Sequence, residues 1–244
     1  MNGGGPVIPT FGGGSAHSLS CVKNNGLFCW SWFDSNWSGT LWPALRQHVV
    51  LVAIAVALGF AIAMALALLA HRYGLVEQPV IAFTSFLYTI PSLAFFELLL
   101  GVRGLGLNLL TAEIPLVAYT LLILFRNILT GLRNVPTEVL DAARGMGMSR
   151  RQTLVRVELP LALPAIIAGL RIATVSTVAL GTIAALVDGN YGLGAPILNG
   201  INDYYFKTEL IAAGGLAVLL AIAADGLLVG AQRLLTPWSR MRAA

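Results

Sequence analysis

The sequence TEVLDAARGMGMSRRQTLVRVELP, residues 137–160, is a polar and basic stretch between long apolar blocks. Pro136 suits the first turn of a helix, and Gly147 can adopt the left-handed conformation that ends one. Ser149 followed by Gln152 has the spacing of a capping box, which begins a second helix. The stretch therefore predicts two short helices joined by a glycine turn.

The first of these helices has a small, smooth face. Ala142, Ala143, Met146 and Gly147 fall at helical neighbour spacing, with charged side chains on both sides. Such a face suits insertion into a groove on another protein. The alternative is a loop that packs only on its own helices, and the residues by themselves favour neither interpretation.

The composition indicates an all-α, polytopic membrane protein. The chain has 244 residues, of which 57% are hydrophobic and 11% charged, and its mean hydropathy is +0.80. Soluble domains carry about 25% charged residues. The net charge of +4 does not indicate nucleic-acid binding, because the positive residues follow membrane topology.

Five apolar blocks are long enough to cross a bilayer as helices. They lie at about residues 48–70, 79–100, 114–132, 161–187 and 210–234. Within the second block, Pro91 is expected to kink the helix and to free a backbone carbonyl. Glycine-rich connections follow the second and fourth blocks.

The distribution of arginine and lysine predicts the orientation of the spans. Arginine dominates the connections on the side of residues 134–160, which is therefore expected to be cytoplasmic. The predicted domains are an extracytoplasmic segment 1–47, a transmembrane domain 48–235 and a cytoplasmic tail 236–244. This topology places the N-terminus outside and the C-terminus in the cytoplasm.

The N-terminal segment consists of a Gly- and Ser-rich stretch followed by a stretch rich in tryptophan. Residues 1–20 are rich in Gly and Ser, are expected to be disordered, and do not have the pattern of a signal peptide. Residues 27–45 are expected at the membrane–water interface, where they can form a short helix, and an aromatic cage for a cation is the alternative. This segment contains Trp30, Trp32, Trp37 and Trp42. Cys21 and Cys29 would lie in an oxidising compartment. They would either form a local disulfide or remain as two free thiols, and the sequence does not decide between these alternatives.

Three charged residues fall well inside the third, fourth and fifth predicted spans. Arg126, Arg171 and Asp225 would be costly there unless paired or hydrated. We expect Asp225 to pair with Arg126 or Arg171. The alternatives are a gate on a transport path and arginines that extend to the cytoplasmic interface.

Several small polar residues have two interpretations. Ser92, Ser176 and Thr177 can line a path for a small solute or permit close packing of helices. The loop 190–194 can form a surface for an extracytoplasmic binding protein, or it can be an ordinary glycine turn.

The stretch 137–160 resembles the signature loop of ATP-binding-cassette import permeases. That pattern is Glu-Ala-Ala, three residues, Gly, nine residues, Ile, one residue, Leu-Pro. Here it reads Asp141-Ala142-Ala143, Gly147, Val157 and Leu159-Pro160, with Asp for Glu and Val for Ile. In that family the first helix couples the membrane subunit to a separate ATPase. The resemblance implies this role for the following residues: Glu138, Asp141, Ala142, Ala143, Met146, Gly147, Met148 and Ser149.

Three further stretches are similar to permeases of the osmoprotectant branch: TIPSLA at 89–94, AARGMGM at 142–148 and ELPLALP at 158–164. The resemblance covers roughly residues 40–240. It implies a type I importer (MetI-like) permease fold with five transmembrane helices, located in the plasma (inner) membrane of a prokaryote. It also implies import of glycine betaine, choline or carnitine by alternating access. The alternatives are an importer for an amino acid such as methionine, or a membrane scaffold or sensor without transport.

The sequence lacks the motifs of an ATP-binding or catalytic subunit. It has no G-x-x-x-x-G-K-[ST] phosphate loop and no metal-binding spacing of Cys and His. We therefore expect no cofactor and no enzymatic activity in this chain, with ATP-Mg on a partner. The partners that the resemblance implies are ATPase subunits, a second permease copy or paralogue, an extracytoplasmic substrate-binding protein and the lipid bilayer, and no nucleic acid.

Overall fold

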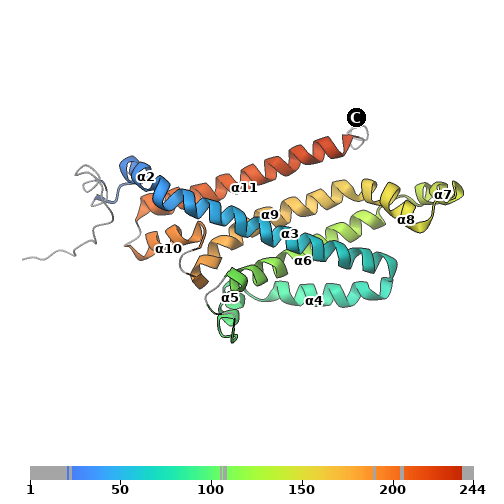
Figure 1. Ribbon diagram of the computed structural model, residues 1–244, viewed down its shortest axis with the longest axis horizontal. Coiled ribbons are helices and arrows are strands. Elements are labelled where there is room, and N and C mark those ends of the chain that lie inside the picture. Colours follow the sequence, from blue (N-terminus) through green and yellow to red (C-terminus); the bar gives the residue numbers. More distant parts are fainter. Residues whose placement is uncertain are drawn as a thin grey trace, which may run out of the picture.

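The apolar blocks form helices that run along one long axis (Figure 1). A computed structural model describes residue 21 and residues 24–104, 106, 109–188, 191–203 and 206–237. Residues 1–20 and 238–244, with the predictions made for them, lie outside this part. Within it the helices are α2 (Trp30–Asn36), α3 (Trp42–Arg72), α4 (Glu77–Thr89), α5 (Ser92–Leu100), α6 (Leu109–Arg133), α7 (Thr137–Gly145), α8 (Arg150–Thr153), α9 (Leu159–Asp188), α10 (Gly194–Asn202) and α11 (Lys207–Leu235).

The two ends of the bundle hold different elements. The short helices α7 and α8 project at one end, and α2 and α10 lie at the other (Figure 1). Helices α3, α6 and α11 run toward the α7 end, whereas α4 and α9 run away from it. The last described residues of α11 therefore lie at the same end of the bundle as α7.

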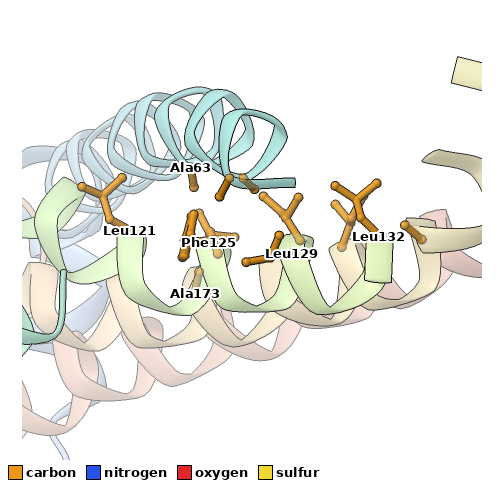
Figure 2. Close-up of a cluster of buried hydrophobic side chains, with 12 residues drawn as sticks. Ala63, Leu121, Phe125, Leu129, Leu132 and Ala173 are labelled. Carbon is orange, nitrogen blue, oxygen red and sulfur yellow. The ribbon is translucent and has the colours of Figure 1, made fainter. Parts of the chain in front are cut away.

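Helix α6 is the centre of the bundle and packs against α3, α4, α5 and α9. Its apolar residues Leu121, Phe125 and Leu129 are buried, and Figure 2 shows them along α6 beside Ala63 of α3 and Ala173 of α9. Large side chains on the central helix thus meet alanines on its neighbours. This pairing lets the helices approach closely, which favours association in a membrane.

Close approach also requires glycine where α3 meets α6. A Cβ atom at Gly59 would lie 1.9 Å from Oγ1 of Thr120. The hydroxyl of Thr120 donates a 2.7 Å hydrogen bond to the carbonyl of Val117. Only glycine fits at position 59 without displacing this side chain.

The second predicted span is not one kinked helix. Helices α4 and α5 are bent by 89° at the break that contains Pro91. Four other helices, at residues 30–72, 109–133, 150–185 and 207–235, are long and apolar enough to cross a membrane, and α4 with α5 makes a fifth only if the bent pair counts as one span. The chain therefore bends at Pro91, as predicted, but it turns almost at a right angle and the helix is interrupted there.

Two connections are more helical than predicted. The first long helix begins at Trp30 instead of His48, because a π-helical turn, Trp37–Leu41, joins α2 to α3. The glycine-rich connection 188–203 contains α10, whose residues Gly194, Ala195 and Pro196 are buried. Composition indicated a loop there, whereas packing on α9 and α11 stabilises a helix.

The N-terminal aromatic segment packs on the start of α11. Cys21 and Cys29 form a disulfide, and the backbone N–H of Cys29 donates to Oγ1 of Thr208 at 2.9 Å. The ring of Trp32 meets that of Phe206 edge to face, with 5.3 Å between ring centroids. The segment is therefore fixed to the protein in addition to any contact with the bilayer.

Candidate functional site

The coupling stretch forms two helices joined by a glycine turn, as its sequence predicts. Gly147 follows α7 with a φ of 78°, and its N–H donates to the carbonyl of Arg144 at 2.9 Å. Ser149 and Gln152 make the reciprocal hydrogen bonds of a capping box at the start of α8. The left-handed glycine and the capping box are confirmed, whereas Pro136 lies one position before α7 and not in its first turn.

The exposed face of α7 differs from the predicted face at one residue. Met146 is 71% exposed, and Ala142 and Gly147 are also exposed. Ala143 is only 1% exposed, because α7 packs on α8 and on the π-helical turn Leu154–Glu158. Ala143 therefore supports the helix from inside and does not belong to the exposed face.

The remaining residues of the predicted coupling set surround this face. Glu138, Asp141 and Ser149 are exposed, and Met148 is half-buried. Asp141 forms an ion pair with Arg144 on the next turn of α7, with 3.2 Å between Oδ1 and Nη1. The face thus combines one large apolar side chain with small residues and a rim of charges.

Two ion pairs at the α7 end connect the spans to one another. Nε2 of His71, at the end of α3, lies 2.6 Å from Oε2 of Glu158, which directly precedes α9. Arg133, at the end of α6, donates two hydrogen bonds of 2.7 and 2.6 Å to Glu77 at the start of α4. Neither pair could be predicted from local sequence, because the partners are 87 and 56 residues apart.

A pocket lies where the chain breaks between α4 and α5. Its volume is about 290 Å³. The hydroxyl of Tyr119 donates a hydrogen bond to the carbonyl of Ile90, which lies at the break. The carbonyl of Leu87, which Pro91 would leave without its helical donor, accepts instead from the N–H of Ile90 at 3.4 Å. The lining residues are Tyr88, Thr89, Ile90, Pro91, Ser92, Tyr119, Thr120, Ile123, Ala173, Ser176, Thr177 and Leu180.

This pocket brings together Ser92, Ser176 and Thr177, the three residues predicted for a solute path. The hydroxyl of Thr177 donates to the carbonyl of Ala173 at 2.7 Å, so it is already used within α9. The hydroxyls of Ser92 and Ser176 make no hydrogen bond within the described residues. Sequence reasoning missed Tyr119, although a tyrosine in the middle of an apolar span was a usable signal.

The structure shows which of the charged residues within the spans form an ion pair. Asp225 of α11 receives hydrogen bonds of 2.7 and 3.0 Å from Nε and Nη2 of Arg171 of α9. Arg126 is exposed on α6 and makes no ion pair within the described part of the chain. Asp225 therefore pairs with Arg171 and not with Arg126.

The glycine loop after α9 is described from Tyr191 onward and is attached to α3. The N–H of Gly192 donates to Oε1 of Gln47 at 3.2 Å, and the N–H of Leu193 donates to Nδ1 of His48 at 3.3 Å. Asn190 lies outside the described residues. Among the described residues, no group of three or more His, Cys, Asp or Glu side chains is arranged to hold a metal ion.

Comparison with known proteins identifies the family of this fold. Residues 40–239 match the family described as "Binding-protein-dependent transport system inner membrane component". The chain belongs to this family. It is therefore a transport permease, and the helices described above are those of a multi-pass membrane protein.

The permease is also similar to individual members of the family. It is 40% identical to the osmoprotectant import permease protein OsmW of Salmonella typhimurium over 78% of this chain and 89% of that protein. It is 39% identical to the glycine betaine/carnitine/choline transport system permease protein OpuCD of Bacillus subtilis, over 70% and 73% of the two chains. The match to each relative extends over most of the length of this chain.

A solved structure shows the same fold. The permease aligns with a chain of the MetNI methionine ABC transporter in an inward-facing conformation, with a TM-score of 0.68 and 21% identity. The match covers 80% of this permease and 95% of that chain. The predicted all-α, MetI-like permease fold is confirmed.

Proposed function

We propose that this permease is the membrane subunit of an ATP-driven importer for osmoprotectants such as glycine betaine, choline and carnitine. The observation that carries the solute class is the 40% identity to an osmoprotectant permease over most of both chains. The methionine transporter is 21% identical, so its likeness supports the fold alone. Import of an amino acid such as methionine is therefore the weaker alternative.

The exposed face of α7 is the proposed docking site for a separate ATPase. It projects at one end of the bundle, where no other span covers it (Figure 1). Met146 is the large apolar side chain that would enter a groove, while Ala142 and Gly147 leave room for the groove walls. Glu138, Asp141 and Ser149 would meet polar groups at the rim of that groove.

The structure offers a continuous helical route from this face to the pocket. Residues 150–185 form one helix of 36 residues, so a displacement of α7 and α8 moves α9. The pair between His71 and Glu158 transfers the same displacement to α3. Because Ser176 and Thr177 of α9 line the pocket, motion at α7 reaches the proposed solute path.

The transport cycle follows from this coupling. Binding of ATP-Mg closes two ATPase subunits and brings the coupling helices together, so the spans change from inward-open to outward-open. A binding protein then releases solute into the path, and hydrolysis restores the inward-open state. ATP-Mg is bound by the ATPase, and the permease contributes the path and the mechanical link.

The proposed assembly has further partners. A second permease copy or a paralogue completes the path, as the family resemblance implies. An extracytoplasmic binding protein delivers the solute, in agreement with the description of the family as binding-protein-dependent. The proposed orientation places α7 in the cytoplasm beside the ATP pool, with the N-terminal segment outside, in accord with the arginine-rich connections.

Uptake of labelled solutes tests the proposed function. The permease is expressed with its ATPase and binding-protein partners, in cells that lack their own betaine and methionine importers. We expect uptake of labelled glycine betaine at high salt, because the relatives' solutes are of this class, and no uptake of methionine above background. Uptake of methionine without glycine betaine would contradict the proposal.

A further inference from the structure

The pocket at the α4–α5 break lies deep in the bundle, away from both ends. Pro91 lies 14 residues after Glu77, where α4 begins, and Tyr119 lies 14 residues before Arg133, where α6 ends. Both of these helix ends are at the α7 end of the bundle (Figure 1). At a rise of 1.5 Å per residue, each separation is about 20 Å. The hydrocarbon core of a bilayer is about 30 Å thick. A solute crossing along these helices therefore meets this pocket inside the membrane.

Two tyrosines form adjacent walls of the pocket. The ring centroids of Tyr88 and Tyr119 are 5.7 Å apart, and the ring planes meet at 76°. Tyr119 is held from two further directions, by its hydrogen bond to Ile90 and by the ring of Phe95 at 6.0 Å. Tyr119 is buried, whereas Tyr88 is 47% exposed.

The other walls combine hydroxyl groups with apolar side chains and carry no charge. Every described residue that lines the pocket is apolar, aromatic or hydroxylic. The hydroxyls of Ser92 and Ser176 have no partner within the described residues and are free to hydrogen-bond a ligand. The volume is near the lower end of ligand pockets, which run from about 300 to 1,000 Å³, so a small solute fits best.

We propose that this pocket is a transit binding site for a quaternary ammonium group, which contacts the rings of Tyr88 and Tyr119 while Ser92 and Ser176 hydrogen-bond the polar end of the same solute. Aromatic rings attract such cations through their electron-rich faces. Glycine betaine, choline and carnitine all carry a trimethylammonium group. The inference rests on the proposed function for the identity of the natural solute, and it makes the permease itself selective.

The proposal is tested with a single introduced thiol, Ser176→Cys. Both cysteines of the chain are in the disulfide, so the new thiol is the only free one in the permease. Reconstituted complex is treated with 2-(trimethylammonium)ethyl methanethiosulfonate or with its neutral isostere, 3,3-dimethylbutyl methanethiosulfonate. The reaction rate at residue 176 is followed by mass spectrometry and divided by the rate of each reagent with a small thiol in solution.

We expect the cationic reagent to react about five- to tenfold faster than the neutral isostere after this correction, the size of one cation–π contact. Tyr88→Leu in the same background is expected to bring the ratio to about one, and Tyr88→Phe to preserve it, because a phenyl face also attracts cations. Tyr73→Leu is the matched control, because Tyr73 is a half-exposed tyrosine at the α7 end, far from the pocket. It should leave the ratio unchanged.

Three results would overturn the site. They are equal corrected rates for the two reagents, a ratio that Tyr88→Leu does not change, and a thiol at residue 176 that reacts with neither reagent. The measurement uses no transported solute, so it is separate from the uptake experiment. Uptake of glycine betaine with a ratio of one would remove the site alone, whereas uptake of methionine alone would remove the proposed function.

Discussion

Replacing Met146 with Asp is expected to abolish solute uptake while the permease still inserts into the membrane. Met146 is 71% exposed, so the variant loses little packing within the permease itself. In the complex, however, the new carboxylate would be buried in the ATPase groove without a partner. An unpaired buried charge costs about 3–5 kcal/mol, which corresponds to a loss of association of roughly 100-fold or more.

The experiment compares uptake of labelled glycine betaine with the amount of ATPase that co-purifies with the permease. Gly147→Asp should act in the same direction, since it places a side chain on the same face at a position with positive φ. Leu75→Asp is the control, because Leu75 is an exposed apolar residue at the same end of the bundle but outside α7 and α8. Normal uptake and ATPase recovery in Met146→Asp would remove the case for this face.

Replacing Asp225 with Asn is expected to lower the yield of folded permease several-fold. Asp225 accepts two hydrogen bonds from Arg171 of the neighbouring span. An amide leaves the guanidinium without a counter-charge within the membrane, where charged side chains are strongly disfavoured. The measurement is the fraction of detergent-solubilised protein that elutes as a single species in size-exclusion chromatography.

Two further variants separate loss of the pair from loss of one side chain. The double substitution Arg171→Leu with Asp225→Leu should recover much of the yield, because it removes both charges together. Arg126→Leu should have little effect, since Arg126 is exposed and makes no ion pair in the described part of the chain. An unchanged yield in Asp225→Asn would show that the pair does not stabilise the fold.

Local chemistry made the coupling stretch predictable. The left-handed residue Gly147 and the capping box of Ser149 and Gln152 are set by residues within a few positions of one another. The long spans were predictable from hydropathy, because the length and composition of a segment decide whether it can cross the bilayer as a helix. The sequence also indicated a break at Pro91, since proline removes a backbone donor.

Features that depend on distant contacts were not predictable. The 89° bend after α4 is accompanied by the hydrogen bond from Tyr119 and by burial of Phe96 among residues of α3, α6 and α9. The burial of Ala143 and the pair between His71 and Glu158 likewise depend on elements far apart in the chain. Helical spacing places a residue on a face but does not say which face the rest of the protein covers.

The most direct test of the central claim is a cryo-electron microscopy structure of the permease with its ATPase in lipid nanodiscs. Our account predicts that residues 137–147 lie on the cytoplasmic side, with Met146 inserted into a groove of the ATPase and Ala143 facing α8 of the permease. An assembled complex in which residues 137–147 contact no ATPase, or lie on the outer side of the bilayer, would contradict it.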